Sequence, residues 1–168
     1  MLTANAQNTA ATRKQVAEIR KIYAQTKESL QFRKDAELPP DEMVVNNDYM
    51  AAGAGPIKDT YHYFFSGDYN EDFGGEVYTV HFITRNHNIG AIDFYEEYLF
   101  NEEGSLVFYY EKNGQDETRY YFDEGRLIHS IITGKESNWK EIDADLTMLH
   151  RFAADTMGAF NLLMNRGY

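Results

Sequence analysis

Three residue types that could act together on a small molecule occur on neighbouring predicted strands of this sequence. Glu97 could serve as a general base, Arg119 could anchor an anionic group, and His129 titrates near neutral pH. Aromatic side chains are predicted to surround them: Tyr95, Phe108, Tyr110 and Tyr121. Polar groups that converge within an aromatic surround are typical of small-molecule sites. The pattern therefore makes these residues the candidate ligand-binding site.

The alignment of these residues follows from three short turns between strands. A two-residue loop at Asn113-Gly114, a pair favoured by type I′ turns, sets the register of the central hairpin. Loops over 101–104 and 123–125 set the registers on either side of it. Side chains alternate between the two faces of a strand, so the turns predict which residues share a row. The predicted row consists of Glu97, Phe108, Arg119 and His129, with Tyr95, Tyr110 and Tyr121 in the adjacent rows.

Three interpretations of this mixed sheet face stay open. It could bind a small molecule, or it could be a half-solvated face with cross-strand charge pairs. It could also be a protein interface, because Tyr and Arg are enriched at interface cores. An enzyme would use Glu97 or His129 as acid or base and Arg119 as an electrostatic stabiliser. The mixed face is also predicted to carry Leu99, Leu106, Glu117, Leu127 and Ile131.

The opposite face of the same strands is predicted to be a core face. Its apolar side chains are Ile92, Phe94, Tyr98, Phe100, Val107, Tyr109, Tyr120, Phe122, Ile128 and Ile132. Its charged residues, Glu96, Glu111 and Arg126, are predicted to lie mostly near strand ends. A long amphipathic helix is expected to cover this face.

Metal and cofactor motifs are weak in this sequence. Oxygen donors alternate at Asp68, Asn70 and Asp72, which makes these residues weak candidates for calcium ligands. The match to an EF-hand is poor, because Gly74 stands at the seventh position and Thr79 at the twelfth. The sequence has no cysteine and lacks nucleotide-binding and nucleophile-elbow motifs, so we expect no cofactor.

The segment that positions the candidate site alternates in the way strands do. Tyr, Phe, Ile and Val are frequent between Asp41 and Gly134, with turns that contain Gly. The predicted strands cover about 43–50, 57–66, 76–86, 89–100, 105–112, 115–122 and 126–133. The last four should form an antiparallel meander, in which the sequence of 98–106 returns in shortened form at 120–127. The segment 51–56 is predicted to be a loop.

Helices are predicted at both ends of the chain. Apolar spacing of three and four residues predicts a first helix over 12–35, which Pro39-Pro40 would end. A second helix is predicted from Asn138 to about Gly167, long enough to cross a whole sheet. Its apolar stripe contains Trp139, Ile142, Leu146, Leu149, Ala153, Thr156, Phe160 and Leu163.

Charge is distributed unevenly between the first helix and the rest of the chain. Residues 1–35 contain seven basic and three acidic residues, whereas the whole chain has 16 basic and 27 acidic residues. We expect the basic helix to dock on the acidic remainder, and a membrane surface or an anionic polymer is the alternative. The net charge of −11 argues against a nucleic-acid partner, because phosphate binding needs a basic face.

The first residues suggest a compartment. Ala4-Asn5-Ala6 is a small-x-small tripeptide of the kind that signal peptidase cuts after. In its leader and general build the chain resembles small uncharacterised exported proteins of Bacteroidetes-type bacteria. That resemblance implies a periplasmic or secreted protein and carries no activity with it; a cytoplasmic location is the alternative. No stretch of the sequence is apolar enough for a transmembrane helix.

Together these patterns predict an α+β protein. A leader over 1–11 precedes one domain over 12–168, with a curved antiparallel meander of six or seven strands packed against a long C-terminal helix. We expect a non-catalytic binding or interaction protein of the bacterial cell envelope that uses the Tyr-rich face. Its partner would be a protein or a small polar or anionic ligand, and a homodimer is compatible with the pattern. The alternatives are a carrier for a small molecule or lipid, and the enzyme described above.

Overall fold

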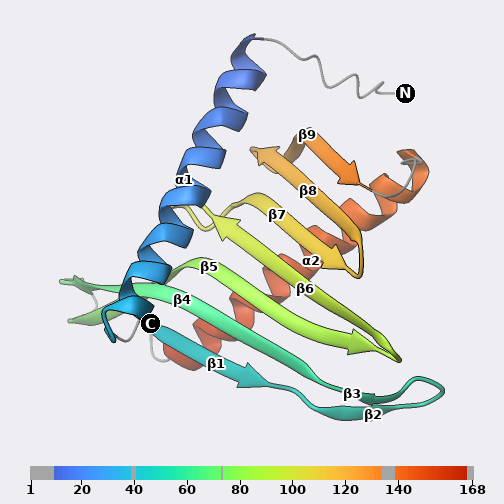
Figure 1. Cartoon of the computed structure of the whole chain (residues 1–168). Helices are drawn as coiled ribbons and strands as arrows, with labels where there is room; N and C mark the ends of the chain where they lie inside the picture. The colour runs from blue at the N-terminus through green and yellow to red at the C-terminus, as the bar shows by residue number, and fades with distance from the viewer. Residues whose placement is uncertain (1–9, 39–40, 73, 134–138, 166–168) are drawn as a thin grey trace.

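A seven-stranded antiparallel sheet with one helix on each face forms the computed structural model of this chain (Figure 1). The structure describes residues 10–38, 41–72, 74–133 and 139–165. Helix α1 (Ala10–Asp35) lies across one face and helix α2 (Trp139–Met164) across the other. The predicted α+β class, with its two helices and its antiparallel meander, is confirmed.

The strands follow one another in space nearly as they do in sequence. They are β1 (Glu42–Asn46), β2 (Tyr49–Ala51), β3 (Gly55–Ile57), β4 (Asp59–Asn70), β5 (Gly75–Ile89), β6 (Ile92–Phe100), β7 (Leu106–Asn113), β8 (Asp116–Asp123) and β9 (Arg126–Thr133). The large sheet has the order β1-β4-β5-β6-β7-β8-β9. The short strands β2 and β3 pair only with each other and form a hairpin at the edge of the sheet (Figure 1). The prediction of a loop over 51–56 was therefore wrong at both ends: 52–54 form the turn, whereas Ala51, Gly55 and Pro56 are strand residues.

The turn between β7 and β8 differs from the predicted one by a single residue. Asn113 pairs with Asp116, so the two central residues are Gly114 and Gln115 rather than Asn113 and Gly114. Gly114 alone has a positive φ, of 57°. A positive φ at the first central residue only is the mark of a type II′ turn, whereas type I′ needs it at both. When the turn moves by one residue along the chain, each residue of β7 pairs with a β8 residue two positions further along than predicted.

The turn between β8 and β9 differs from the predicted one as well, because it is one residue shorter. Asp123 pairs with Arg126, which leaves Glu124 and Gly125 as a two-residue loop, with φ values of 47° and 72°. Both are positive, as a type I′ turn requires. The pairing then shifts between Tyr121 and Phe122, where one extra residue enters β9. The predicted three-residue loop over 123–125 was wrong.

The β6–β7 and β8–β9 hairpins each contain a shift in pairing that moves individual side chains to the other face of the sheet. Between Leu99 and Phe100 the pairing also shifts by one, so Val107 is the extra residue and Phe100 pairs with Leu106. A β-bulge of this kind breaks the alternation of faces locally. Leu106 and Leu127 consequently pack on the α2 side, whereas Val107 and Ile128 pack on the α1 side. The predicted faces of these four residues were wrong.

Helix α1 ends through a left-handed residue. The backbone N–H of Leu38 donates to the carbonyl of Arg33, and that of Glu37 donates to the carbonyl of Lys34. Glu37 has a φ of 55°. This is the Schellman pattern, usually made by Gly, and it ends the helix before the predicted stop at Pro39-Pro40. Those prolines, and the predicted α2 caps Asn138 and Gly167, lie outside the described residues.

Each helix buries an apolar stripe against its own face of the sheet. On α2, the buried residues Leu149, Ala153 and Phe160 belong to the predicted stripe. On α1, Val16 and Ile19 pack into a second cluster with Phe82, Leu99, Phe108 and Tyr121. The basic helix α1 therefore docks on the sheet of its own chain, as predicted, and it covers the mixed face.

Candidate functional site

The predicted site residues share one face, but in a different register. Glu97 pairs with Tyr110, which pairs with Arg119. Phe108 pairs with Tyr121, which pairs with His129 in the next row. The predicted row of Glu97, Phe108, Arg119 and His129 was therefore wrong. Because the registers moved by two residues, the side chains kept their face.

Helix α1 seals the centre of this predicted site. Glu97 is 1% exposed, and its Oε1 accepts hydrogen bonds from Lys27 Nζ at 2.5 Å and from the Tyr95 hydroxyl at 2.6 Å. The Tyr23 hydroxyl donates to Oε2. Burial and then the Glu97 carboxylate raise the pKa of Tyr23 and Tyr95, so both hydroxyls stay protonated as donors. Both oxygens of the Glu97 carboxylate thus already accept hydrogen bonds from residues of the protein itself.

The remaining predicted site residues are spread along the face that α1 covers. Arg119 donates to Glu117 at 2.7 Å and lies over the ring of Tyr110, 5.1 Å from its centroid. His129 lines a cavity of about 400 Å³ near the N-terminal half of α1, whereas Tyr95 lines one of about 560 Å³ near its C-terminal half. Burial, followed by the charge of Arg20, lowers the pKa of His129. Glu97 and His129 lie on β6 and β9, so the structure does not bring them together as an acid/base pair.

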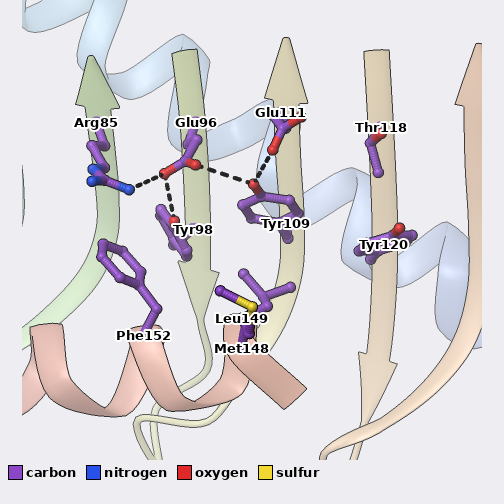
Figure 2. Close-up of a pocket in the computed structure, with 10 residues that line it drawn as sticks. All are labelled: Arg85, Glu96, Tyr98, Tyr109, Glu111, Thr118, Tyr120, Met148, Leu149 and Phe152. Atoms are coloured by element: carbon purple, nitrogen blue, oxygen red, sulfur yellow. Dashed lines mark hydrogen bonds and ion pairs between the residues drawn. The ribbon is translucent and has the colours of Figure 1, made fainter. Parts of the chain in front are cut away.

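A different pocket, on the α2 side of the sheet, combines charged and aromatic groups (Figure 2). Its volume is about 380 Å³. Its charged wall contains Arg85, Glu96 and Glu111, from three neighbouring strands. Its other lining residues are Tyr98, Tyr109, Thr118 and Tyr120 from the sheet and Met148, Leu149 and Phe152 from α2.

Glu96 is the centre of the charged wall. It is 6% exposed and accepts hydrogen bonds from the Tyr98 hydroxyl at 2.6 Å and from Arg85 Nη1 at 3.2 Å. His87 Nε2 lies 3.3 Å from its other oxygen. Burial by itself would raise the pKa of Glu96, but His87, Arg85 and Tyr98 outweigh it and hold that pKa below the usual value. Glu96 is therefore an anion at neutral pH.

Arg85 is held rigidly beside this carboxylate. Its Nε and Nη2 donate to the two oxygens of Asp59 at 2.8 and 2.9 Å, and Asp59 is 3% exposed. The guanidinium also lies over the rings of Phe152 and Tyr61, at 4.6 and 5.1 Å from their centroids. A bidentate pair combined with ring contacts leaves this side chain little freedom.

The tyrosines connect the two glutamates of the pocket. The Tyr109 hydroxyl donates to Glu111 at 2.9 Å and lies 3.4 Å from Glu96 (Figure 2). Burial and then the charge of Glu96 raise the pKa of Tyr98 and Tyr109 well above the usual value. Asn113 Nδ2 donates to the other oxygen of Glu111 at 3.2 Å. The charged wall is therefore an ordered network in which Arg85 and neutral donors hold the two glutamates.

Sequence reasoning did not find this pocket. It placed Glu96 and Glu111 as charges near strand ends on a core face, and it assigned no partner to Arg85 or Asp59. The usable signal was the presence of two carboxylates on an otherwise apolar face, because buried charge is rare unless it is paired. The charged partner of Glu96 is Arg85 on β5, which in turn pairs with Asp59 on β4, and the turns did not predict the pairing of these two strands.

The weak calcium candidates form part of a hairpin. Asp68 and Asn70 lie in β4, and the Asn70 Oδ1 accepts the backbone N–H of Asp72 at 3.0 Å, as in an Asx turn. Within the described ranges, no three His, Cys, Asp or Glu side chains come together as metal ligands would.

The fold and the pocket define an α+β protein with a charged, aromatic cavity between its sheet and its C-terminal helix. Compared with protein-family models, with curated proteins and with solved structures, the chain matches none. Among the described helices, neither is both long and apolar enough to cross a membrane.

Alkaline pH is expected to unfold this protein through its tyrosines. Burial raises the pKa of Tyr63 to about 12, and it raises the pKa values of Tyr98 and Tyr109 as well. In the unfolded chain tyrosine ionises near pH ~10, so above that pH the unfolded state loses protons that the folded state retains. Stability is therefore complete below pH ~10 and falls as the pH rises above it.

This alkaline transition can be followed by tyrosinate absorbance together with circular dichroism. The buried tyrosines should ionise only together with loss of structure. Ionisation of all tyrosines in one gradual step, with the circular dichroism unchanged, would contradict the buried placement.

Proposed function

We propose that this chain is a non-catalytic binding protein that takes a small ligand into the pocket between the sheet and α2. The observation that carries the proposal is the buried network of Asp59, Arg85 and Glu96 beside an open cavity. A buried ion pair contributes little net stability, because desolvation offsets the attraction. Clusters of buried, perturbed ionisable groups in a cleft are typical of functional sites.

The protonation behaviour of the wall favours binding over proton-transfer chemistry. A general acid or base works best with a pKa near the working pH. In this pocket the pKa of Glu96 is lowered and those of Tyr98 and Tyr109 are raised, so all three move away from neutrality. Such groups hold a fixed protonation state, which suits recognition of a ligand.

The lining favours a ligand with one polar end and one apolar end. Charged groups occupy one side of the pocket, and Met148, Leu149 and Phe152 of α2 occupy the other (Figure 2). The volume is at the lower end of the ~300–1,000 Å³ usual for small-molecule sites. A wholly apolar ligand would leave the charged wall without a polar partner. The pocket therefore suits an amphiphilic molecule better than a lipid tail alone.

The proposed site keeps the tyrosine-based binding expected from the sequence but changes the face. The tyrosines expected to bind were Tyr95, Tyr110 and Tyr121, which lie beneath or beside α1. A location in the cell envelope stays a proposal, supported by the Ala4-Asn5-Ala6 leader alone. Fractionation of expressing cells tests it, and recovery of the full-length chain in the cytoplasm alone would contradict it.

Filling the pocket should abolish ligand binding. Thr118→Phe places a ring between the charged wall and α2, whereas Gln115→Phe adds the same ring at an exposed turn outside the pocket. We would measure melting temperatures with three probes of one shape: phenylethylammonium, phenylethanol and phenylpropanoate. A probe at ~100 times its dissociation constant stabilises the fold by ~2.7 kcal/mol, or roughly 5–10 °C for a chain of this size.

The expected result is a shift with at least one probe in the wild type and in Gln115→Phe, and none in Thr118→Phe. A shift that survives in Thr118→Phe would place the binding elsewhere. No shift with any probe at millimolar concentration would remove the support for a small-molecule pocket of this shape.

A further inference from the structure

We infer that the pocket between the sheet and α2 selects a ligand whose polar end is an ammonium group. The inference rests on the proposed function, since it names the ligand class of the same pocket. The groups around the cavity carry a surplus of negative charge. Three carboxylates belong to the connected network, those of Asp59, Glu96 and Glu111; the guanidinium of Arg85 contacts the first two, and Tyr109 links Glu111 to Glu96.

The positive groups already present do not neutralise this surplus. Two of the Arg85 hydrogen bonds go to Asp59, and a third, longer one goes to Glu96. His87 is the other basic group beside Glu96, and even a protonated His87 leaves one carboxylate uncompensated. Glu111 is held by the neutral donors of Tyr109 and Asn113, which satisfy its oxygens but not its charge.

The aromatic part of the lining also favours a cation. Tyr98, Tyr109 and Tyr120 stand side by side, with centroid distances of 5.2 Å and 6.1 Å between neighbours. The faces of neutral aromatic rings attract cations within about 6 Å. Arg85 already uses Phe152 in this way, so the wall accommodates positive charge.

An ammonium group matches the donors and acceptors of the charged wall. It offers three N–H donors and no acceptor, whereas Glu96 and Glu111 offer carboxylate oxygens only. A ligand carboxylate would meet two like charges in a partly desolvated site, which is unfavourable. This ligand class is the opposite of the anionic one that Arg119 suggested.

Binding of the three matched probes tests the inference. Phenylethylammonium, phenylethanol and phenylpropanoate share a phenyl body and differ in charge at the end. We expect titration calorimetry to give an affinity for the ammonium about tenfold or more above that for the alcohol, with the carboxylate weakest. Glu111→Gln should reduce the ammonium affinity about tenfold and the alcohol affinity much less, whereas the exposed Glu102→Gln should change neither.

The outcomes separate this inference from the proposed function. Equal or tighter binding of the alcohol or the carboxylate in the pocket overturns the ammonium preference and leaves the binding function standing. Binding of none of the probes removes the support for both.

A ligand-free comparison keeps the inference testable if Glu111→Gln alters the fold. Thr118 lines the pocket and pairs directly with Glu111 across the hairpin. Thr118→Lys would place an ammonium at this wall, and Thr118→Glu would add a further carboxylate. We expect the lysine variant to melt several degrees above the glutamate variant at low salt; equal melting temperatures, or the reverse order, would overturn the inference.

Discussion

Replacing Arg85 with methionine is expected to lower the free energy of unfolding by about 3–5 kcal/mol. Methionine keeps much of the length of the side chain, but it removes the guanidinium and the contact of that group with Phe152. The carboxylates of Asp59 and Glu96 would then stay buried without the cation that compensates them. An uncompensated buried charge is among the most costly defects that a single substitution creates.

Urea denaturation measures this loss, and Arg126→Met is its matched control. Arg126 also pairs with a carboxylate, that of Glu124, but its side chain is 79% exposed and the pair is worth about 0–1 kcal/mol. The double variant Arg85→Met with Asp59→Asn should recover part of the loss, because it removes one of the two stranded charges. Equal stability of Arg85→Met and Arg126→Met would show that the network is hydrated rather than buried.

Replacing Glu97 with alanine is expected to destabilise the protein by about 2–5 kcal/mol. The substitution leaves the hydroxyls of Tyr23 and Tyr95 without their acceptor beneath α1. Lys27 loses its partner as well, but its half-exposed side chain can return to water. Because the lost contacts join α1 to the sheet, hydrogen exchange in α1 should accelerate more than exchange in α2.

Glu117→Ala is the control for this substitution. Glu117 lies on the same face and pairs with Arg119, but the pair is partly exposed and should be worth at most about 1 kcal/mol. The site predicted from the sequence makes the opposite prediction, namely that Glu97 variants fold normally and lose binding or activity. A stable Glu97→Ala variant with unchanged exchange in α1 would favour that site over the role in helix docking.

The order of elements could be predicted because it depends on local patterns. Alternating apolar residues marked the strands, and apolar spacing of three and four residues marked both helices. The basic charge of the first helix indicated docking on the acidic remainder, and Lys27 makes such a contact with Glu97. The seven predicted site residues also kept their common face, because at their positions each register error was two residues.

The registers and the bulges could not be predicted with the same certainty. Both Asn113-Gly114 and Gly114-Gln115 are acceptable central pairs for a two-residue turn, and cross-strand packing selects the second. The bulges beside Leu99 and Tyr121 compensate for turn length and twist. They moved Leu106 and Leu127 to the face of α2, which alternation along a strand does not predict.

The sequence by itself determined the α+β class, the two helices, the meander and the face on which each regular strand residue lies. Those properties depend on the periodicity of apolar side chains and on local turns, which can be followed along the chain. Only the tertiary structure decided which face stayed open. Packing of α1 closed the face of Glu97, whereas pairing of β4, β5 and β6 brought Asp59, Arg85 and Glu96 together beside α2. Contacts between residues distant in sequence set that outcome, because burial and charge pairing depend on what lies opposite each side chain.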